Sequence, residues 1–402
     1  MKRPDASSVI AIVCIVLIAV MSAGLGYMLH DRIKPADAAD FSAVTEMAGV
    51  IKKHFYFYDA EKNDEALVRD ALRGMVGGLD DPYAGYYTRE EYDELLAEDA
   101  GEYRGLGISV AVPDERGSEI LSVYAGSPAA NAGIYKGDVI TDINGVHVPG
   151  LSMDDFVAAF SADDAVPDEI TLLRDGRTIL VSVLRDVVHV ARVSFEQLDD
   201  GVGYIRISEF HGTVAHEFWS AVQSLQASGM TRLVLDLRDN PGGGLTEVLG
   251  VANRLVPKGE LIATIRSKTD DAEVYYSTGD ERLTDVPIAV LVNGGSASAS
   301  ELLSGALQDN GIAKIVGTQT YGKGIVQTYF RLSGSGGWVK LTTEAYYTPN
   351  DVCIHGVGIT PDLTVELPET LRSVAVEELA HGEDTQLQAA IVLLKNPSQE
   401  AA

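Results

Sequence analysis

A long apolar stretch near the start of the chain is its first strong pattern. Residues 7–29 include no charged side chain. A helix over residues 9–29, at ~1.5 Å per residue, would match a hydrocarbon core of ~30 Å, whereas a cleavable signal peptide has only ~7–15 apolar residues. We therefore predict a transmembrane anchor over residues 9–29, with cleavage near residues 36–38 as the alternative. Lys2 and Arg3 favour a cytoplasmic N-terminus, residues 1–8, with the rest of the chain outside.

Residues 30–40 are polar and predict a linker, and a helical pattern follows them. Val44, Met47 and Ile51 recur at intervals of three and four, as apolar positions on one face of a helix do. Farther along, Thr88 is followed three residues later by Glu91, which is the spacing of a capping box and predicts a helix start. We expect a small helical module over residues 41–101.

Between residues 102 and 187 the pattern changes to short apolar runs separated by glycine turns. Asn144-Gly145 and Asp175-Gly176 each stand between two such runs, and both pairs are strong signals for a β-hairpin. One amphipathic helix is expected over residues 153–160. This part of the chain predicts a small domain built mainly of β-strands.

From residue 188 to residue 368, apolar strands alternate with helices. Strands are expected over residues 203–207, 233–237, 288–292 and 312–316, and helices over residues 214–227 and 299–308. Fully apolar strands are typical of a buried parallel sheet, and the alternation indicates an α/β layer fold. Residues 369–402 predict a C-terminal helix and tail. The chain as a whole is expected to be a multidomain α/β protein.

The net charge of the chain argues against some classes of binding partner. Of 402 residues, 59 are acidic and 31 are basic, which gives a net charge of −28. Such a chain repels phosphates, and this argues against nucleic acid as a partner. The only cysteines, Cys14 and Cys353, exclude a disulfide framework, and no HExxH motif is present. We expect no metal and no other cofactor.

A run of small residues joins one apolar strand to the next helix and holds three candidate nucleophiles. Ser296, Ser298 and Ser300 stand at this junction, where N–H groups of the helix start can stabilise an oxyanion. No GxSxG motif is present and the histidines offer no base, so Lys323, which has glycines on both sides, is the candidate. A lysine has a pKa of ~10.4, and desolvation lowers it. Periodicity does not choose among the serines, and a solvated lysine in a flexible loop is the alternative.

A glycine-rich loop after another apolar strand is the third signal. Gly242, Gly243 and Gly244 follow Pro241, and consecutive free N–H groups in such a loop form an anion-binding nest. The anion could be a phosphate or the oxyanion of a reaction intermediate. The P-loop motif is absent and the net charge disfavours phosphate.

In this order, these segments resemble the C-terminal processing proteases, the tail-specific family of Ser/Lys peptidases. The segments that carry the resemblance are residues 74–92, 103–108, 127–145, 236–243, 296–301, 321–327, 343–349 and 358–362. The resemblance implies a PDZ domain, compact and β-barrel-like, over residues 102–187. It implies a protease core over residues 188–368 with α/β layers like those of ClpP and crotonase.

The resemblance also implies roles for five residues of the core. It places the nucleophile at Ser298, the base at Lys323, and the side chain that orients this lysine at Gln327. The backbone N–H groups of Ala299 and Gly243 would form the oxyanion hole, with the preceding glycine as the alternative to Gly243.

A PDZ domain binds a peptide by adding it as a strand to a sheet edge, while a turn offers N–H groups to its C-terminal carboxylate. Leu106, Gly107 and Ile108 fit that turn, and Val110 alternates onto the same face as Ile108. Phe156 would line the apolar pocket or else belong to the domain core. The expected ligand has an apolar C-terminal residue.

The expected function is that of an extracytoplasmic serine endopeptidase, anchored in the cell membrane by a single span. Its PDZ domain would capture C-terminal or unstructured segments of protein and peptide substrates, and a homodimer is left open. A PDZ adaptor with a degenerate core is one alternative, and intact Ser298, Lys323 and Gln327 argue against it. An enzyme acting on acyl-CoA thioesters is another, and the absence of a basic nucleotide site argues against that.

Overall fold

The structure, a computed structural model, describes residues 41–99, 102–124, 126–161, 163, 165–189, 191–268, 271–279 and 281–396. The predicted cytoplasmic N-terminus, transmembrane anchor and linker, residues 1–40, lie outside these ranges. Among the described residues, no helix combines the length and the apolar character that a membrane span requires.

The chain divides into two compact units, Met1–Leu72 and Arg73–Ala402. Helix α2 (Ser42–His54) and most of α3 (Ala60–Gly77) make up the described part of the first unit. The predicted helical pattern is present, but Val44 and Met47 are 47% and 64% exposed. Neither helix has a buried residue, so the apolar face of α2 is open to solvent in the described chain.

Beyond α3, the predicted helical module departs from a purely helical structure. Strand β1 (Gly85–Tyr87) pairs antiparallel with β18 (Trp338–Tyr347), so this segment joins a sheet of the second unit. Three residues are too few to show a strand pattern in the sequence. Helix α4 (Arg89–Asp99) begins with the predicted capping box, in which the N–H of Thr88 donates to Glu91 Oε2 at 2.8 Å and the N–H of Glu91 to Thr88 Oγ1 at 3.2 Å.

The β-rich domain follows as expected. Its elements are β2 (Glu102–Gly105), β3 (Ile108–Val110), β4 (Ser118–Val123), α5 (Pro128–Asn131), β5 (Val139–Ile143), β6 (Val146–His147), α6 (Met153–Ala158), β7 (Asp168–Arg174), β8 (Arg177–Val183) and β9 (Asp186–His189). Strands β3, β4, β5, β7 and β8 form one sheet in that order, with β3 at its edge. Strand β2 pairs with β9, which joins the two ends of the domain.

Both predicted hairpins are present in this domain. Asn144 and Gly145, between β5 and β6, have φ of 50° and 81°, and Asp175 and Gly176, between β7 and β8, have φ of 49° and 74°. Two consecutive positive φ values define the type I′ turn, whose twist matches that of the paired strands.

The second half of the chain forms the α/β core. Its elements are β10 (Val193–Gln197), η1 (Asp199–Gly201), β11 (Val202–Ile207), α7 (Val214–Ala227), β12 (Arg232–Asp236), α8 (Leu245–Leu255), β15 (Ile288–Val292), α9 (Ala299–Asp309), β16 (Ala313–Gly317), β19 (Leu363–Thr364), η2 (Glu369–Leu371), η3 (Val376–Glu378) and α10 (Thr385–Lys395). The sheet order is β10-β11-β12-β15-β16-β19, and all neighbours from β11 onward are parallel. The predicted parallel sheet is confirmed.

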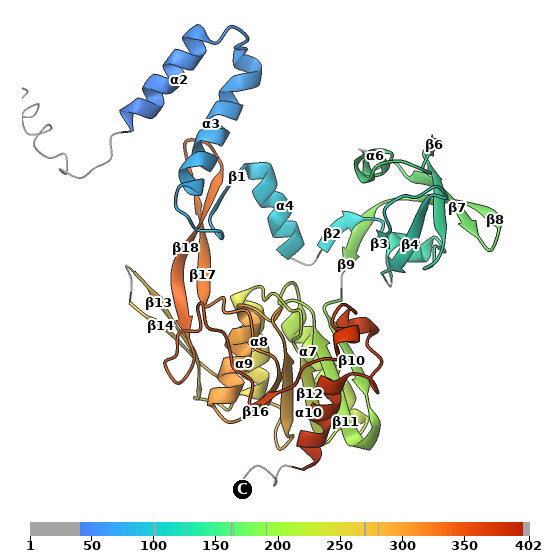
Figure 1. Cartoon of the computed structure of the whole chain (residues 1–402), viewed down its shortest axis with the longest axis vertical. Coiled ribbons are helices and arrows are strands. Elements are labelled where there is room, and N and C mark those ends of the chain that lie inside the picture. The colour runs from blue at the N-terminus through green and yellow to red at the C-terminus, as the bar shows by residue number, and fades with distance from the viewer. Residues whose placement is uncertain are drawn as a thin grey trace, which may run out of the picture. The chain divides into compact units, whose positions relative to one another are not determined.

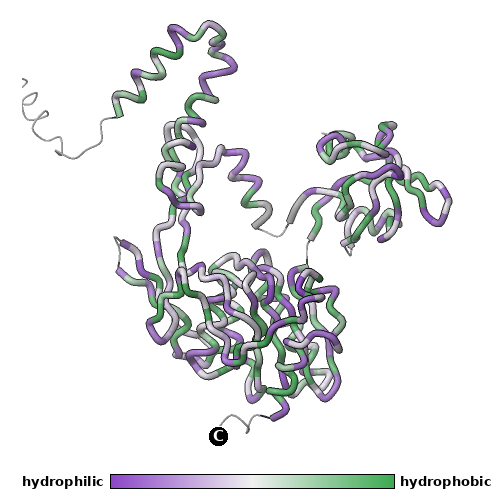
Figure 2. Tube along the Cα trace, viewed as in Figure 1, coloured by the Kyte–Doolittle hydropathy of each residue, from purple (hydrophilic) through white to green (hydrophobic). Residues whose placement is uncertain are grey.

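Helices cover both faces of this sheet (Figure 1). Alternate strand residues such as Leu235 and Val290 pack with α7, α8 and α9 on one face, and Val234 and Leu291 pack with α10 on the other. Apolar residues run through the interior of this three-layer core in Figure 2. Burial on both faces explains why these strands are apolar at every position.

A second, antiparallel sheet lies beside the core and was not expected from the sequence. It contains β13 (Leu261–Ser267), β14 (Glu273–Tyr276), β17 (Ile325–Arg331) and β18, together with β1. Most residues of β17 and β18 are only half-buried. This sheet matters for function because Gln327 lies on β17 and Tyr346 on β18.

Candidate active site

Three loops meet at one edge of the α/β core. They follow β12, β15 and β16, which are neighbours in the parallel sheet, so their carboxyl ends lie side by side. Ligand sites of open α/β sheets lie at the carboxyl ends of the strands. The loops carry the glycine run, the serine run and Lys323, which are the chemical patterns that the sequence singled out.

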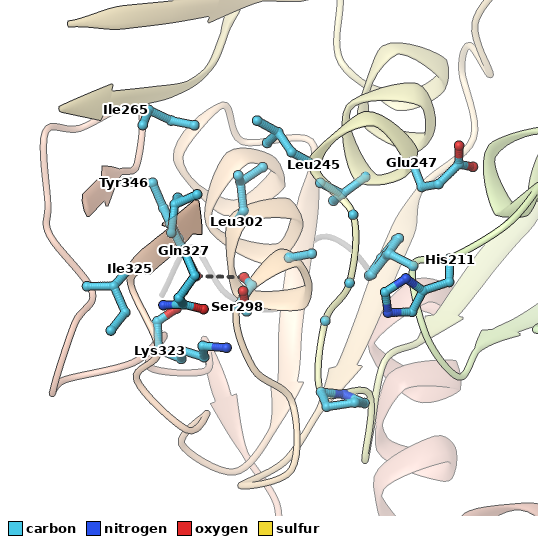
Figure 3. A pocket seen from close by; sticks show the side chains of 18 of the residues that line it. His211, Leu245, Glu247, Ile265, Ser298, Leu302, Lys323, Ile325, Gln327 and Tyr346 are labelled. Carbon is cyan, nitrogen blue, oxygen red and sulfur yellow. Dashed lines mark hydrogen bonds between the residues drawn. The ribbon is translucent and has the colours of Figure 1, made fainter. Parts of the chain in front are cut away.

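The structure distinguishes the three serines. The side chain of Ser296 is buried and its Oγ donates to a backbone carbonyl at 2.7 Å, and Ser300 does the same at 3.0 Å. These two hydroxyls hold the loop together. Ser298 is half-buried and lines a cavity of about 830 Å³ together with Lys323 and Gln327 (Figure 3). It is therefore the serine that a substrate can reach.

The backbone of Ser298 is strained. Eight non-glycine residues in the described chain have a positive φ; seven are Asp or Asn, which tolerate this region, and the eighth is Ser298. Its φ of 54° and ψ of −113° also fall outside the left-handed helical region. Backbone strain of this kind costs ~1–3 kcal/mol and persists only where surrounding contacts hold it.

The carboxylate of Glu301 supplies part of that support. It is fully buried and accepts hydrogen bonds from Ser298 N–H at 2.8 Å, Thr320 Oγ1 at 2.6 Å, Gly322 N–H at 2.7 Å and Lys323 N–H at 2.8 Å. One side chain thus ties the start of α9 to the loop that carries Lys323. It fixes the backbone of both candidate catalytic residues.

Lys323 lies half-buried in the same cavity. Burial lowers the pKa of its ammonium group, and the positive charge of Lys340 lowers it further. Its Nζ lies 4.8 Å from the centroid of the Tyr83 ring, and no hydrogen bond to Ser298 is present among the described residues. Catalytic hydrogen bonds of this type often tighten only in the complex with substrate.

Gln327 reaches the cavity from β17 but does not bond to Lys323. Its Nε2 donates to Thr342 Oγ1 at 3.4 Å. Tyr346, which is buried, makes the link between the two loops instead, because its hydroxyl lies 2.7 Å from Ser298 O and 2.5 Å from Lys323 O. The orienting role of Gln327 stays a prediction.

Two backbone N–H groups beside Ser298 have no partner in the described chain. The N–H groups of Gly242 and Gly244 donate to Asn240 Oδ1 and Phe210 O, whereas that of Gly243 donates to none. The parallel β-bridge between Phe210 and Gly243 is formed by the hydrogen bonds that Phe210 makes with Gly242 and Gly244. In this pattern the N–H of Gly243 points away from Phe210. The N–H of Ala299, at the first turn of α9, is likewise unpaired.

Close packing brings these groups together. A Cβ on Gly242 would lie 2.8 Å from Ser298 Cβ and 3.0 Å from Ala299 N. Asn240 joins the two loops, since its carbonyl accepts from the N–H of Ala297 at 2.9 Å and from Ser300 Oγ at 3.0 Å. The geometry favours Gly243 over Gly242 as an oxyanion donor.

A buried network of ion pairs holds the start of the loop that carries the glycine run. Arg238 is 1% exposed and its guanidinium contacts Asp236 at 2.5 Å and Asp384 at 2.8 Å. Burial lowers the pKa of Arg238, but the two carboxylates outweigh it and raise the pKa overall. The network ties the segment before α10 to the loop after β12. Removing one partner would leave a buried charge without compensation, so the network stabilises the fold only while it is complete.

The remainder of the cavity is mainly apolar. Leu245, Val248, Ile265 and Leu302 are among its lining residues. His211 and Glu247 lie on the side away from Lys323 (Figure 3). No cluster of three or more His, Cys, Asp or Glu side chains that could hold a metal occurs within the described residues. The arrangement provides a hydroxyl, a desolvated amine and two N–H donors around one apolar cavity.

The predicted peptide-binding residues lie together in the β-rich domain. Ile108 and Val110 are on β3, the edge strand, and pack partly buried against the core. The N–H groups of Leu106 and Gly107 donate no hydrogen bond within the described chain, and Gly107 has φ of 79°. Phe156 is 3% exposed and lies in the domain core, with its ring 5.4 Å from Phe160.

Three residues that the structure places at this site were not predicted from the sequence. Glu301 could have been found, since it follows Ser298 by three residues as in a capping box. Tyr83 and Tyr346 had no such signal. They reach Lys323 from distant segments, Tyr83 from the loop before β1 and Tyr346 from β18.

Comparisons with known proteins agree with this geometry. Residues 201–365 match the family described as Peptidase family S41, and residues 119–174 match the PDZ domain. A carboxy-terminal-processing protease of Bartonella bacilliformis is 36% identical over 312 residues, which cover 76% of this chain and 71% of that protein. The chain belongs to peptidase family S41.

One further relative supports the same assignment, and one solved structure shares the fold of this S41 peptidase. A Staphylococcus aureus protein named as a probable CtpA-like serine protease is 33% identical over 357 residues, covering 88% of this chain and 71% of that protein. A crystal structure from Bacteroides fragilis, assigned provisionally to the S41 proteases, shares the fold with a TM-score of 0.53 at 16% identity and covers 90% of this chain and 99% of that one. The S41 peptidase described here is thus a serine peptidase with a PDZ domain.

Proposed function

We propose that Ser298 and Lys323 form the catalytic dyad of this peptidase. The observation that carries the proposal is the position of Ser298, whose hydroxyl faces the cavity on a strained turn beside two unpaired N–H groups and a desolvated lysine. Serine is a weak nucleophile until a neighbouring base accepts its proton. A lysine whose pKa is lowered by burial can serve as that base.

The reaction would run through an acyl-enzyme. Ser298 Oγ attacks the carbonyl carbon of the scissile peptide bond while neutral Lys323 takes the hydroxyl proton, and the N–H groups of Gly243 and Ala299 stabilise the oxyanion. When the C–N bond breaks, the ammonium of Lys323 gives its proton to the leaving amine. Water then hydrolyses the ester with Lys323 again as the base. Gln327 would orient Lys323 once the amine of Lys323 turns toward Ser298.

Covalent labelling with a fluorophosphonate tests the dyad directly. We expect the wild-type peptidase to be modified at Ser298, Ser298→Ala to be unmodified, and Lys323→Met to react much more slowly, because the reagent needs the same activated hydroxyl as a substrate. Mass spectrometry of proteolytic fragments identifies the modified residue. Labelling at another serine would mean that the nucleophile is not Ser298, and labelling at none would favour the adaptor with a degenerate core.

We further propose that the PDZ domain recruits the C-terminal segment of a substrate to β3. The edge position of β3 and the unpaired N–H groups of Leu106 and Gly107 support this proposal. A β-strand can add to such an edge, with its carboxylate on the free N–H groups. The partly buried Ile108 and Val110 would contact the peptide's apolar side chains.

Gly107→Val should impair cleavage of long peptides and spare small activated esters. A Cβ at this position would lie 2.2 Å from Ser127 Cβ, and the positive φ disfavours a β-branched residue. Turnover of both substrates is compared in the variant and the wild type. Amidating the C-terminus of the long peptide provides a control that leaves the protein intact and should weaken binding by about tenfold, as loss of charge-assisted hydrogen bonds does. Equal affinity for the acid and the amide would contradict the proposal.

The membrane anchor and the extracytoplasmic location belong to the same proposal. The apolar residues 9–29 and the basic Lys2 and Arg3 support them. We expect the full chain to sediment with membranes after a high-salt wash, and a chain lacking residues 1–40 to be released. If the core lies outside the cytoplasm, a protease added to cells without their cell wall, but with an intact cytoplasmic membrane, should digest the peptidase. A full chain that stays in the soluble fraction would contradict the anchor.

A homodimer through the first helices is also proposed. Val44 and Met47 are exposed on α2, and burial against a second copy would remove this apolar surface from water. Sedimentation equilibrium of the chain from residue 41 onward, with Met47→Glu as the matched variant, measures the association. Monomers at micromolar concentration in the unmodified chain would contradict it.

A further inference from the structure

Two lysines share the cavity of Ser298, and neither has an acidic partner among the residues that the structure describes. Lys323 and Lys340 both line it, and within the described chain neither forms an ion pair. Acidic residues outnumber basic ones by 59 to 31 in this protein, so an unpaired lysine pair in a mainly apolar cavity is unexpected. Like charges in a poorly solvated site repel each other, and this repulsion is relieved when one of them loses its proton.

An aromatic cluster fixes Lys340. Its Nζ lies 5.6 Å from the ring centroid of Tyr329, which is its cross-strand partner on β17. The ring centroid of Tyr329 lies 5.9 Å from that of Tyr87 and 5.2 Å from that of Tyr92. Tyr92 stacks on Trp338, with 4.1 Å between the ring centroids. A cation over an aromatic face is stabilised in its charged form. Lys323 makes the same kind of contact with the ring of Tyr83, so the aromatic contacts do not distinguish the two lysines, and burial is what first lowers the pKa of Lys323.

The other groups around Lys323 do not offset this charge. A hydrogen bond to Tyr321, more than burial, raises the pKa of the Tyr83 phenol, so Tyr83 stays neutral. Burial raises the pKa of Tyr346 as well. Two carboxylates lie near Tyr83: that of Glu301 is held by four donors, and that of Asp81 accepts the N–H of Tyr83 at 2.9 Å.

The two titratable groups on the far side of the cavity are Glu247 and His211. Glu247 accepts the N–H of Ala215 at 2.9 Å and lies with His211 away from Lys323 (Figure 3). The exposed side chain of His355 belongs to the segment packed behind Gly324. None of these groups pairs with the ammonium of Lys323 in the described structure.

We propose that Lys340 is a positioning residue of this peptidase, whose fixed positive charge keeps the amine of Lys323 unprotonated and ready to accept the proton of Ser298. The inference rests on the proposed role of Lys323 as the base. The lowered pKa of Lys323, caused first by burial and then by Lys340, agrees with it. Lys340 itself exchanges no proton in the reaction.

The test separates the charge of Lys340 from its shape. In Lys340→Met, kcat/KM should fall about 3- to 30-fold at pH 7 and return to near the wild-type value at high pH, because a nearby unit charge changes a pKa by about a unit. Lys340→Arg retains the charge and should keep the wild-type pH profile. Lys136→Met makes the same change in net charge at an exposed lysine of the PDZ domain and should leave the profile unchanged.

A second measurement does not depend on catalysis. In the Ser298→Ala background, the pH dependence of reductive methylation of Lys323, read by mass spectrometry of its peptide, reports the protonation of this amine. Its midpoint should move to higher pH when Lys340→Met is added, and should stay in place with Lys340→Arg.

The two readouts fail in different ways. A shifted methylation midpoint with an unchanged rate profile would support the influence of Lys340 on Lys323 and overturn Lys323 as the base. An unchanged midpoint would overturn the proposal for Lys340. A rise in KM at every pH with an unchanged midpoint would do the same, and would mean that Lys340 binds substrate instead.

Discussion

Ser298→Ala is expected to lower peptidase activity by at least about 10³-fold, since no other hydroxyl in the serine run faces the cavity. The variant removes one half-exposed oxygen and leaves the hydrogen bond from the Ser298 N–H to Glu301 in place. Folding should therefore be unaffected. Peptide hydrolysis and thermal unfolding of the purified variant measure the two effects.

Ser296→Ala and Ser300→Ala are the matched controls. Each removes a buried hydroxyl that bonds a backbone carbonyl, so each should cost about 1–2 kcal/mol of stability. Both should retain most of their activity at a temperature where they are folded. An inactive, folded Ser300→Ala together with an active Ser298→Ala would show that the nucleophile lies two residues farther along.

Ser298→Gly tests the strain of the turn separately from the chemistry. It should be as inactive as Ser298→Ala, but more stable than that variant by about 1 kcal/mol, because glycine adopts a φ of 54° and ψ of −113° without a clash of its side chain. The comparison is made by urea unfolding of both variants. A less stable glycine variant would mean that the turn is not strained.

Loss of activity at low pH is the second large effect that we expect. Lys323 must be neutral to accept the proton of Ser298, so kcat/KM should rise with pH through the pKa of Lys323 and fall as the lysine becomes protonated. Burial first and the charge of Lys340 second place that pKa below the usual value for lysine. The midpoint of the rate profile should therefore lie below pH ~10.4.

Replacing the base should abolish this activity. Lys323→Met and Lys323→Arg are both expected to lose at least about 10³-fold, the first because it has no amine and the second because a guanidinium does not lose its proton at these pH values. Substantial activity in Lys323→Arg would rule out the lysine as the base. Chelators should leave the wild-type rate unchanged, and inhibition by them would indicate a metal.

The same burial predicts a gain in stability for Lys323→Met. The pKa of Lys323 is lower in the folded protein than in the unfolded chain, so burying the protonated lysine lowers the free energy of unfolding. This loss of stability is complete below the pKa of the folded protein, and it disappears as the pH rises toward ~10.4, the pKa of the unfolded chain. The methionine variant lacks this penalty, so it should unfold at a higher temperature than the wild type at neutral pH. The difference should narrow as the pH is raised.

Local patterns in the sequence were sufficient for most of the core. Strands β12 and β15 are apolar at nearly every position because helices cover both faces of the parallel sheet, and their composition alone predicts that burial. The Asn144-Gly145 hairpin and the Thr88 capping box depend on the conformations of adjacent residues. Such features can be read from a few consecutive residues.

The second sheet could not be read in this way. Most positions of β17 and β18 are half-buried, so neither strand alternates clearly between apolar and polar residues. Strand β1 has three residues and exists because it pairs with β18, far along the chain. Tyr346 and Tyr83 reach Lys323 through this sheet and the loop before β1, which is why no sequence pattern pointed to them.

The sequence by itself determined which residue types stand in the three loops: the serine run, the glycine run and the lysine between two glycines. Only the tertiary structure decided which of their hydroxyl and N–H groups are already bonded and which are left free within the described chain. Ser298 is distinguished from Ser296 by the direction of its hydroxyl, and Gly243 from Gly242 by which N–H is already bonded. These choices depend on hydrogen bonds between segments that follow different strands, and such bonds form only when β12, β15 and β16 pair side by side.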